Sequence, residues 1–202
     1  MNFVSRGFSR RRSVPDELRE RVPPGQYVEK GFPVLTAGPT PHVDTPEWQF
    51  RIDGMVAQER TWSWEEFTGL PFEDVPCDIH CVTKWSKLGT SFRGVSVDTL
   101  LQGVEPQGGF AVAFSYGGYT TNLPLDDLTG GEAWVVTEHE AGPLPREHGG
   151  PARLLVPHLY FWKSAKWVAG LRVLDHDEPG FWEQNGYHNR GDPWKEERYW
   201  SD

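Results

Sequence analysis

The chain has 202 residues, of which 37% are hydrophobic and 13% aromatic, and a formal net charge of −9. This length suffices for one domain with a sizeable core, and the aromatic content excludes a low-complexity disordered chain. The acidic balance excludes nucleic acid as the main partner because a phosphate backbone requires a basic surface, and no run approaches the ~18 apolar residues of a membrane span.

The N-terminal segment differs from the rest in charge. Residues 1–30 carry seven Lys or Arg against four Asp or Glu and are predicted to form an irregular arm. Arg10-Arg11-Arg12 is interpreted as a basic tail and not as an export signal, because the polar run 13–17 follows it. We therefore expect a soluble, cytoplasmic protein.

Residues 31–202 are predicted to form one α+β domain with mixed or antiparallel sheets. Prolines keep residues 31–46 extended or turned. Alternating and apolar runs predict strands at 48–52, 74–83, 110–116, 119–121, 134–138, 153–156 and 168–174. Capping patterns predict short helices at 63–69 and 96–101, and 161–166 is expected to form a helical turn. From about residue 175 an acidic, aromatic-rich extension is expected to wrap the body.

Cys81 is the first residue with candidate chemistry. It follows Asp78-Ile79-His80 at the end of a predicted strand and precedes Val82-Thr83-Lys84-Trp85. A thiol in this position can be a small core residue, a nucleophile activated by a histidine, or a metal ligand. Zinc is disfavoured because Cys77, His80 and Cys81 have no second Cys or His pair at zinc-finger spacing.

Two further segments have polar groups suited to a ligand. His148-Gly149-Gly150-Pro151 leads into a strand that begins at Arg153, which suggests a polar clamp beside a tight backbone, although a surface turn has the same pattern. In the second segment, 161–167, Lys163 and Lys166 are expected to share a face of a helical turn. With the Ser164 hydroxyl they would form a phosphate cradle.

Together these segments resemble the sulfite oxidase superfamily of molybdopterin-dependent oxidoreductases. The resemblance covers most of residues 31–200. The chain is most similar to small cytoplasmic sulfite oxidase-like proteins, which are related to the catalytic subunit of the periplasmic methionine-sulfoxide reductase. The specific segments are 78–87, 119–125, 148–157, 163–167 and 179–188.

The resemblance implies a role for each matching residue. Cys81 corresponds to the cysteine whose thiolate ligates molybdenum, and soft molybdenum favours such a sulfur ligand. We expect neighbouring cationic groups to keep this thiol ionised. The resemblance implies that the molybdenum-molybdopterin cofactor is held by these residues: His148, Arg153, Lys163, Ser164, Lys166 and, more loosely, Ser115.

The implied activity is a two-electron oxygen-atom transfer on a small-molecule substrate, with an unidentified redox partner. Leu35 and Ala37 stand where sulfite oxidases have an arginine and a histidine. Reduction of a sulfoxide or another S- or N-oxide is therefore the first expectation. Sulfite-type oxidation and a non-catalytic molybdopterin carrier are the alternatives, and a cysteine hydrolase is a third.

Overall fold

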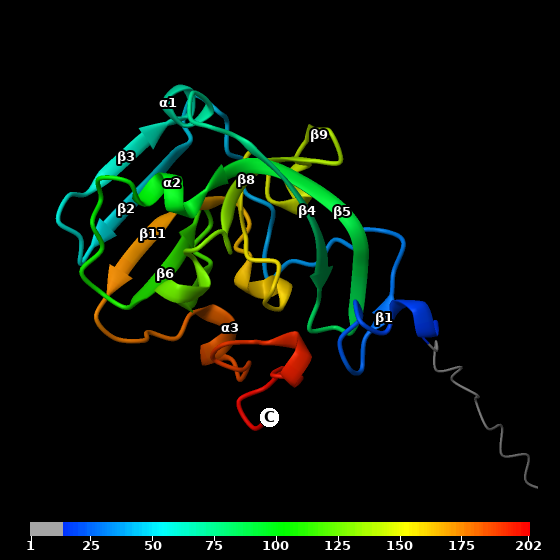
Figure 1. Ribbon diagram of the computed structural model, residues 1–202. Coiled ribbons are helices and arrows are strands. Elements are labelled where there is room, and N and C mark those ends of the chain that lie inside the picture. The colour runs from blue at the N-terminus through cyan, green and yellow to red at the C-terminus, as the bar shows by residue number, and fades with distance from the viewer. Residues whose placement is uncertain (1–13) are drawn as a thin grey trace, which may run out of the picture.

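The computed structural model describes residues 14–202, so the basic run Arg10-Arg11-Arg12 lies outside the described part of the chain. Two sheets form the body (Figure 1). The first has the order β1 (Tyr27–Val28), β5 (Trp85–Ser96), β8 (Trp134–His139) and β10 (Arg153–Leu155), with β4 (Glu73–His80) paired to β5 and β9 (Gly142–Pro143) paired to β8. The second has the order β3 (Arg60–Ser63), β2 (Gln49–Gly54), β11 (Val168–Leu174), β6 (Phe110–Ser115) and β7 (Thr120–Pro124).

The helices are short. They are α1 (Trp64–Thr68), α2 (Val97–Leu101), α3 (Phe181–Gln184) and the 3₁₀ turns η1 (Asp16–Leu18), η2 (Leu125–Asp127), η3 (Arg146–His148), η4 (Phe161–Lys163) and η5 (Pro193–Lys195). Ser63 caps α1 through the expected capping box with Glu66. None of the helices in residues 14–202 has the length and apolar character needed to cross a bilayer. Mixed sheets with few helices confirm the predicted fold class.

The longest strand, β5, was not predicted. Its sequence contains Gly89 and Gly94 and lacks a regular alternation, so it has no strand pattern. Gly94 is required by packing, since a Cβ there would lie 2.2 Å from the Val135 carbonyl oxygen on β8. β5 connects three partners, because β1 pairs with it in parallel, and β4 and β8 pair with it in antiparallel register.

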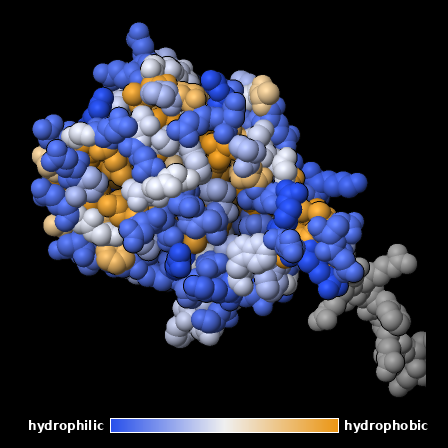
Figure 2. Space-filling view, in the orientation of Figure 1, coloured by the Kyte–Doolittle hydropathy of each residue, from blue (hydrophilic) through white to orange (hydrophobic). Residues whose placement is uncertain are grey.

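The core lies on the inner faces of the two sheets. Trp48, Phe50 and Phe67 are fully buried in the larger apolar cluster, and the Trp48 indole N–H donates to the Val168 carbonyl at 3.1 Å. A smaller cluster around Ile79, Trp85 and Tyr160 includes Cys81. The face shown in Figure 2 is largely hydrophilic, with small apolar patches. Because Cys81 belongs to the smaller cluster, its backbone lies in a packed region, and the residue also lines the cavity described below.

Candidate functional site

Cys81 lies in the tight turn between β4 and β5. Its N–H donates to the Trp85 carbonyl at 2.8 Å, and Lys84 N–H donates back to the Cys81 carbonyl at 2.9 Å. Gln26 Nε2, from the segment before β1, also donates to that carbonyl at 3.0 Å. These bonds fix the backbone on both sides of the residue, so the thiol projects from a rigid turn and not from the strand that was predicted to extend to residue 83.

The electrostatic environment of the Cys81 thiol differs from the expectation. Burial raises its pKa, and the hydrogen bonds with Thr83, whose hydroxyl lies 3.1 Å from Sγ, oppose that shift. No cationic side chain in the described part of the chain contributes to this shift, so the prediction that neighbouring positive charges ionise this thiol is wrong. A metal ion that coordinated this thiol would remove its proton. The free protein accordingly presents a neutral thiol, which also disfavours an activated nucleophile.

Arg153, at the start of β10, is a buried cation without a carboxylate partner among the described residues. Its side chain is almost completely inaccessible, and its Nη1 and Nη2 atoms donate to the carbonyls of His148 at 2.8 Å and Ser164 at 2.6 Å. The guanidinium also lies 4.0 Å from the centroid of the Phe161 ring. Burial lowers its pKa to about 9, so it stays charged at neutral pH. A desolvated positive charge of this kind favours an anionic ligand.

His148 ends η3 and stacks on Phe32, with the ring centroids 3.8 Å apart and the planes 9° from parallel. Burial, together with Arg153 and Lys166, lowers the pKa of His148 to about 4, so the imidazole is neutral at physiological pH. Its Nδ1 atom is buried and has no hydrogen-bond partner within residues 14–202. A flat aromatic pair with a free ring nitrogen is suited to a heterocyclic ligand.

The cavity brings together most of the predicted site residues. It has a volume of about 500 Å³, and Cys81, His148, Arg153, Ser164 and Lys166 all line it. Lys166 Nζ donates to the carbonyls of Leu35 at 2.7 Å and Glu147 at 2.6 Å. Burial and the nearby Arg153 lower the pKa of Lys166 to about 8. The Ser164 hydroxyl accepts from Val156 N–H at 2.9 Å, so it holds the turn in place.

Lys163 and Ser115 lie outside this lining. Lys163 is fully buried and forms an ion pair with Glu183 at 2.7 Å, while its Nζ also donates to the carbonyls of Asn122 and Asn189. The predicted shared face of Lys163 and Lys166 is wrong because the helical turn ends at Lys163 and Ser164 leaves it with ψ of 78°. Ser115 is buried with an unpartnered hydroxyl, but the neighbouring cavity wall is formed by residues 116–119.

The C-terminal extension supplies a wall that sequence reasoning did not assign. Phe181, Trp182 and Tyr187 line the cavity, and the Trp182 and Tyr187 rings stack with their centroids 4.9 Å apart. Burial raises the pKa of Tyr187, and its neighbours Tyr199 and Cys81 add to the effect, so the phenol keeps its proton. Their segment belonged to the recognised resemblance, but no local pattern indicated that these rings face the cysteine.

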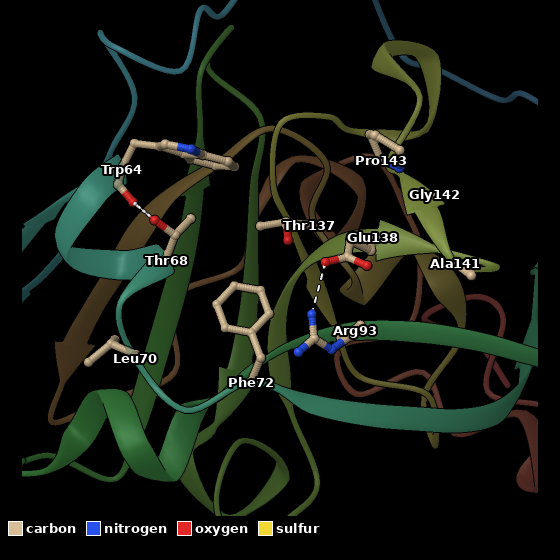
Figure 3. A pocket seen from close by; sticks show the side chains of 10 residues that line it. All are labelled: Trp64, Thr68, Leu70, Phe72, Arg93, Thr137, Glu138, Ala141, Gly142 and Pro143. Atoms are coloured by element: carbon tan, nitrogen blue, oxygen red, sulfur yellow. Dashed lines mark hydrogen bonds and ion pairs between the residues drawn. The ribbon is translucent and has the colours of Figure 1, made fainter.

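A second hollow, of about 480 Å³, lies away from these residues (Figure 3). Its lining includes the aromatic side chains of Trp64 and Phe72. It also includes Arg93 and Glu138, which form an ion pair at 3.1 Å. It contains neither a thiol nor a buried unpaired cation. The cavity of Cys81 is therefore the candidate site. Residues 14–202 contain no group of three or more His, Cys, Asp or Glu side chains placed to hold a metal ion, so the structure gives no support to a zinc site.

The donor set fits the cofactor that the resemblance implies. Molybdopterin has a phosphate, a flat pterin and a dithiolene that holds molybdenum. The cations of Arg153 and Lys166 suit the phosphate, the unpartnered Nδ1 of His148 suits a pterin edge, and the Cys81 thiol suits a soft metal. The buried charge of Arg153 is the strongest part of this fit, because no carboxylate among the described residues neutralises it.

Comparisons with known proteins agree with this fit. The family model described as the oxidoreductase molybdopterin binding domain matches residues 37–182. The uncharacterized oxidoreductase YuiH of Bacillus subtilis (strain 168) is 42% identical over 182 residues, which are 89% of this chain and 92% of YuiH. The catalytic subunit MsrP of the protein-methionine-sulfoxide reductase of Ralstonia nicotianae is 24% identical. That match covers 86% of this chain and 58% of MsrP.

Among solved structures, the sulfane dehydrogenase SoxCD from Paracoccus pantotrophus superposes with a TM-score of 0.66 and 18% identity. The match covers 96% of this chain and 62% of the SoxCD chain. At this identity the likeness shows the fold alone, and that fold is the one expected from the sequence.

Proposed function

The chain belongs to the family of the oxidoreductase molybdopterin-binding domain, and on that premise we propose that it reduces a neutral sulfoxide or a related S- or N-oxide. The observation that carries this proposal is the distribution of charge in the cavity. Arg153 and Lys166 are the cationic side chains among its lining residues, and both are hydrogen-bonded to carbonyls in the clamp. Leu35 and Ala37 provide no charge for an anion such as sulfite.

Bound molybdenum cofactor would supply a two-electron oxygen-atom transfer, in which the S–O bond of the substrate breaks and two electrons and two protons yield the sulfide and water. Cys81 would be the protein ligand of the metal. Arg153, Lys166 and His148 would hold the phosphate and pterin, with Ser164 fixing the turn between them. Ser115 and Lys163 would support this arrangement from behind the cavity wall.

Tyr187 would position the substrate. It keeps its proton, and its ring is held between Trp182 and Trp162, whose centroids lie 4.9 Å and 5.0 Å from that of Tyr187. A phenol fixed in this way donates a hydrogen bond to an oxide oxygen without a large loss of side-chain entropy. Trp182, Phe181 and Leu35 would contact the apolar substituents of the substrate. The name of the MsrP relative, a protein-methionine-sulfoxide reductase, supports the sulfoxide class.

The test is steady-state turnover of the molybdenum-loaded protein with reduced benzyl viologen as electron donor. We expect oxidation of the viologen with methionine sulfoxide or dimethyl sulfoxide, and no turnover by Cys81→Ser. Faster turnover of sulfite with ferricyanide than of any sulfoxide or N-oxide would contradict the proposed direction. Molybdenum bound at one atom per chain without turnover of either kind would favour a cofactor carrier.

We further propose a cytoplasmic location. Cys77 and Cys81 are both free, and burial raises the pKa of the Cys77 thiol to about 12, which is typical of a reduced, unreactive core cysteine. Fractionation of cells followed by immunoblotting tests this proposal, and recovery from the periplasmic or extracellular fraction would contradict it.

A further inference from the structure

A series of aromatic rings in contact leads from the cavity to the exposed Tyr199, and the exposed Trp200 follows Tyr199 in the chain. Phe181, Trp182, Tyr187, Tyr199 and Trp200 are called the aromatic rim below. Centroid distances along the series are 5.0 Å from Phe181 to Trp182, 4.9 Å from Trp182 to Tyr187 and 5.8 Å from Tyr187 to Tyr199. Trp200 lies over Gly186, where a Cβ would be 3.6 Å from the indole Cδ1, and the backbone N–H of Trp200 donates to the Gly186 carbonyl at 3.1 Å.

The outer part of the rim is unusually exposed for aromatic side chains. Trp200 is 79% exposed, Tyr199 49% and Phe181 38%, while Trp182 and Tyr187 are half-buried and line the cavity. Exposed aromatic groups that adjoin a functional cavity are typical of interaction sites. Tyrosine and tryptophan are also the residues that contribute most to the affinity of protein interfaces. The rim therefore has the composition of a docking surface.

The charge around the rim is negative. Residues 175–202 hold eight acidic and three basic residues. Each basic residue is paired: Arg190 with Asp127 at 3.0 Å, Lys195 with Asp192 at 3.6 Å and Arg198 with Glu196 at 3.1 Å. Exposed acids remain on both sides of the rim, with Glu178 before Phe181 and Asp202 after Trp200. A partner with a basic face is complementary to this surface.

We propose that the aromatic rim and its flanking acids form the docking surface for a small one-electron redox protein with a basic, apolar-centred face. This inference rests on the proposed function, which requires two electrons from outside for each oxide reduced. Tyr187 lines the cavity on one side and contacts Tyr199 on the other, so a protein on Tyr199 would be separated from the cavity by these two rings. Electron-transfer complexes are small and short-lived, which suits a patch of a few aromatic residues.

The experiment uses the molybdenum-loaded protein and oxidised cytochrome c as a basic one-electron probe. The protein is reduced with dithionite, freed of excess reductant and mixed with the probe in a stopped-flow instrument. Each two-electron-reduced site passes one electron to each of two haem irons. The variants are Trp200→Ala and Tyr199→Ala, and Met55→Ala is the control, because Met55 is 38% exposed but lies in the turn after β2. Viologen-dependent turnover of methionine sulfoxide is measured for each protein.

We expect Trp200→Ala to lower the second-order rate constant for cytochrome c by about tenfold, with viologen turnover and the Met55→Ala values unchanged. The rate constant of the unsubstituted protein should fall as the ionic strength rises, and Asp202→Asn should weaken this dependence. An unchanged rate in both rim variants would overturn the docking proposal while viologen turnover still supports the enzyme. An equal loss with both reactants would assign the rim to the substrate site, and a dimer abolished by Trp200→Ala would assign it to a second copy of the chain.

Discussion

The buried ion pair between Lys163 and Glu183 allows a quantitative prediction. Both side chains are almost fully inaccessible and their charged atoms lie 2.7 Å apart. Glu183 Oε1 also accepts from Thr121 Oγ1 at 3.0 Å and from Trp162 Nε1 at 2.8 Å, so this one carboxylate ties α3 to β7 and η4. Removal of one member of a buried pair leaves an uncompensated charge and costs about 3–5 kcal/mol.

The substitution Lys163→Met should therefore lower the free energy of unfolding by about 3–5 kcal/mol, a large share of the ~5–15 kcal/mol of a typical domain. At about 2–4 °C per kcal/mol, the midpoint of thermal unfolding should fall by roughly 6–20 °C. The assay is urea unfolding of metal-free protein followed by tryptophan fluorescence. Metal-free protein is used because bound cofactor would itself stabilise the native state.

A double-mutant cycle separates the pair from general damage. Lys163→Met combined with Glu183→Leu should be less destabilising than the sum of the two single substitutions, by about 2 kcal/mol or more. The control is Lys195→Met, since Lys195 is 59% exposed and lies 3.6 Å from Asp192, and it should change stability by less than about 0.5 kcal/mol. Additive single effects, or a Lys163→Met loss no larger than that of the control, would refute the reasoning.

Three further predictions concern the cavity. Arg153→Lys should lower cofactor retention by about ten- to a hundredfold, measured as molybdenum per chain after dialysis, because an ammonium cannot reach both the His148 and Ser164 carbonyls as the guanidinium does. Tyr187→Phe should lower the kcat for sulfoxide by about a hundredfold with molybdenum content unchanged, and a normal kcat would exclude the phenol from the reaction. Lys166, whose pKa is lowered to about 8, should lose its proton in the cofactor-free protein as the pH rises through 8, so binding of cofactor should weaken between about pH 7 and 9. Lys166→Met should abolish that pH dependence. The stability of the cofactor-free protein should rise over the interval from pH 8 towards the usual lysine value of 10.5, because there the unfolded chain binds more protons than the folded one.

Local sequence singled out Cys81, His148 and Arg153 as candidates, and the family resemblance supplied their roles. The sequence pattern puts Cys81 at the end of a strand, and it puts His148 and Arg153 on either side of a Gly-Gly-Pro turn. Each of these local patterns restricts where the backbone can place the side chain. The structure puts all three at one cavity. The residues that contact them could not be predicted in this way. For example, Phe32 stacks on His148 and so joins a proline-rich segment to η3, but no periodicity in either segment indicates that contact.

Lys163 illustrates the opposite case. Its sequence neighbours indicated a phosphate cradle, because Lys163, Ser164 and Lys166 occur together between two tryptophans. The orientation of its side chain is set by Glu183, which belongs to a later segment and supplies a buried counter-charge. A lysine at such a position turns towards the carboxylate because burial without one is costly. Whether a lysine serves a ligand or a carboxylate therefore depends on a long-range contact that single-sequence reasoning does not contain.

The same carboxylate connects stability, catalysis and docking. Glu183 is next to Trp182 and holds α3 against the body, and the chain that follows α3 carries Tyr187 into the cavity wall and Trp200 over Gly186 on the outside. A substitution at Glu183 should thus disturb the fold, the position of the phenol and the aromatic rim together, whereas Trp200→Ala changes the outer surface alone. The two kinds of variant therefore have different expected effects. If Trp200→Ala slows electron transfer without lowering stability or sulfoxide turnover, that loss cannot be attributed to a loosened C-terminal extension.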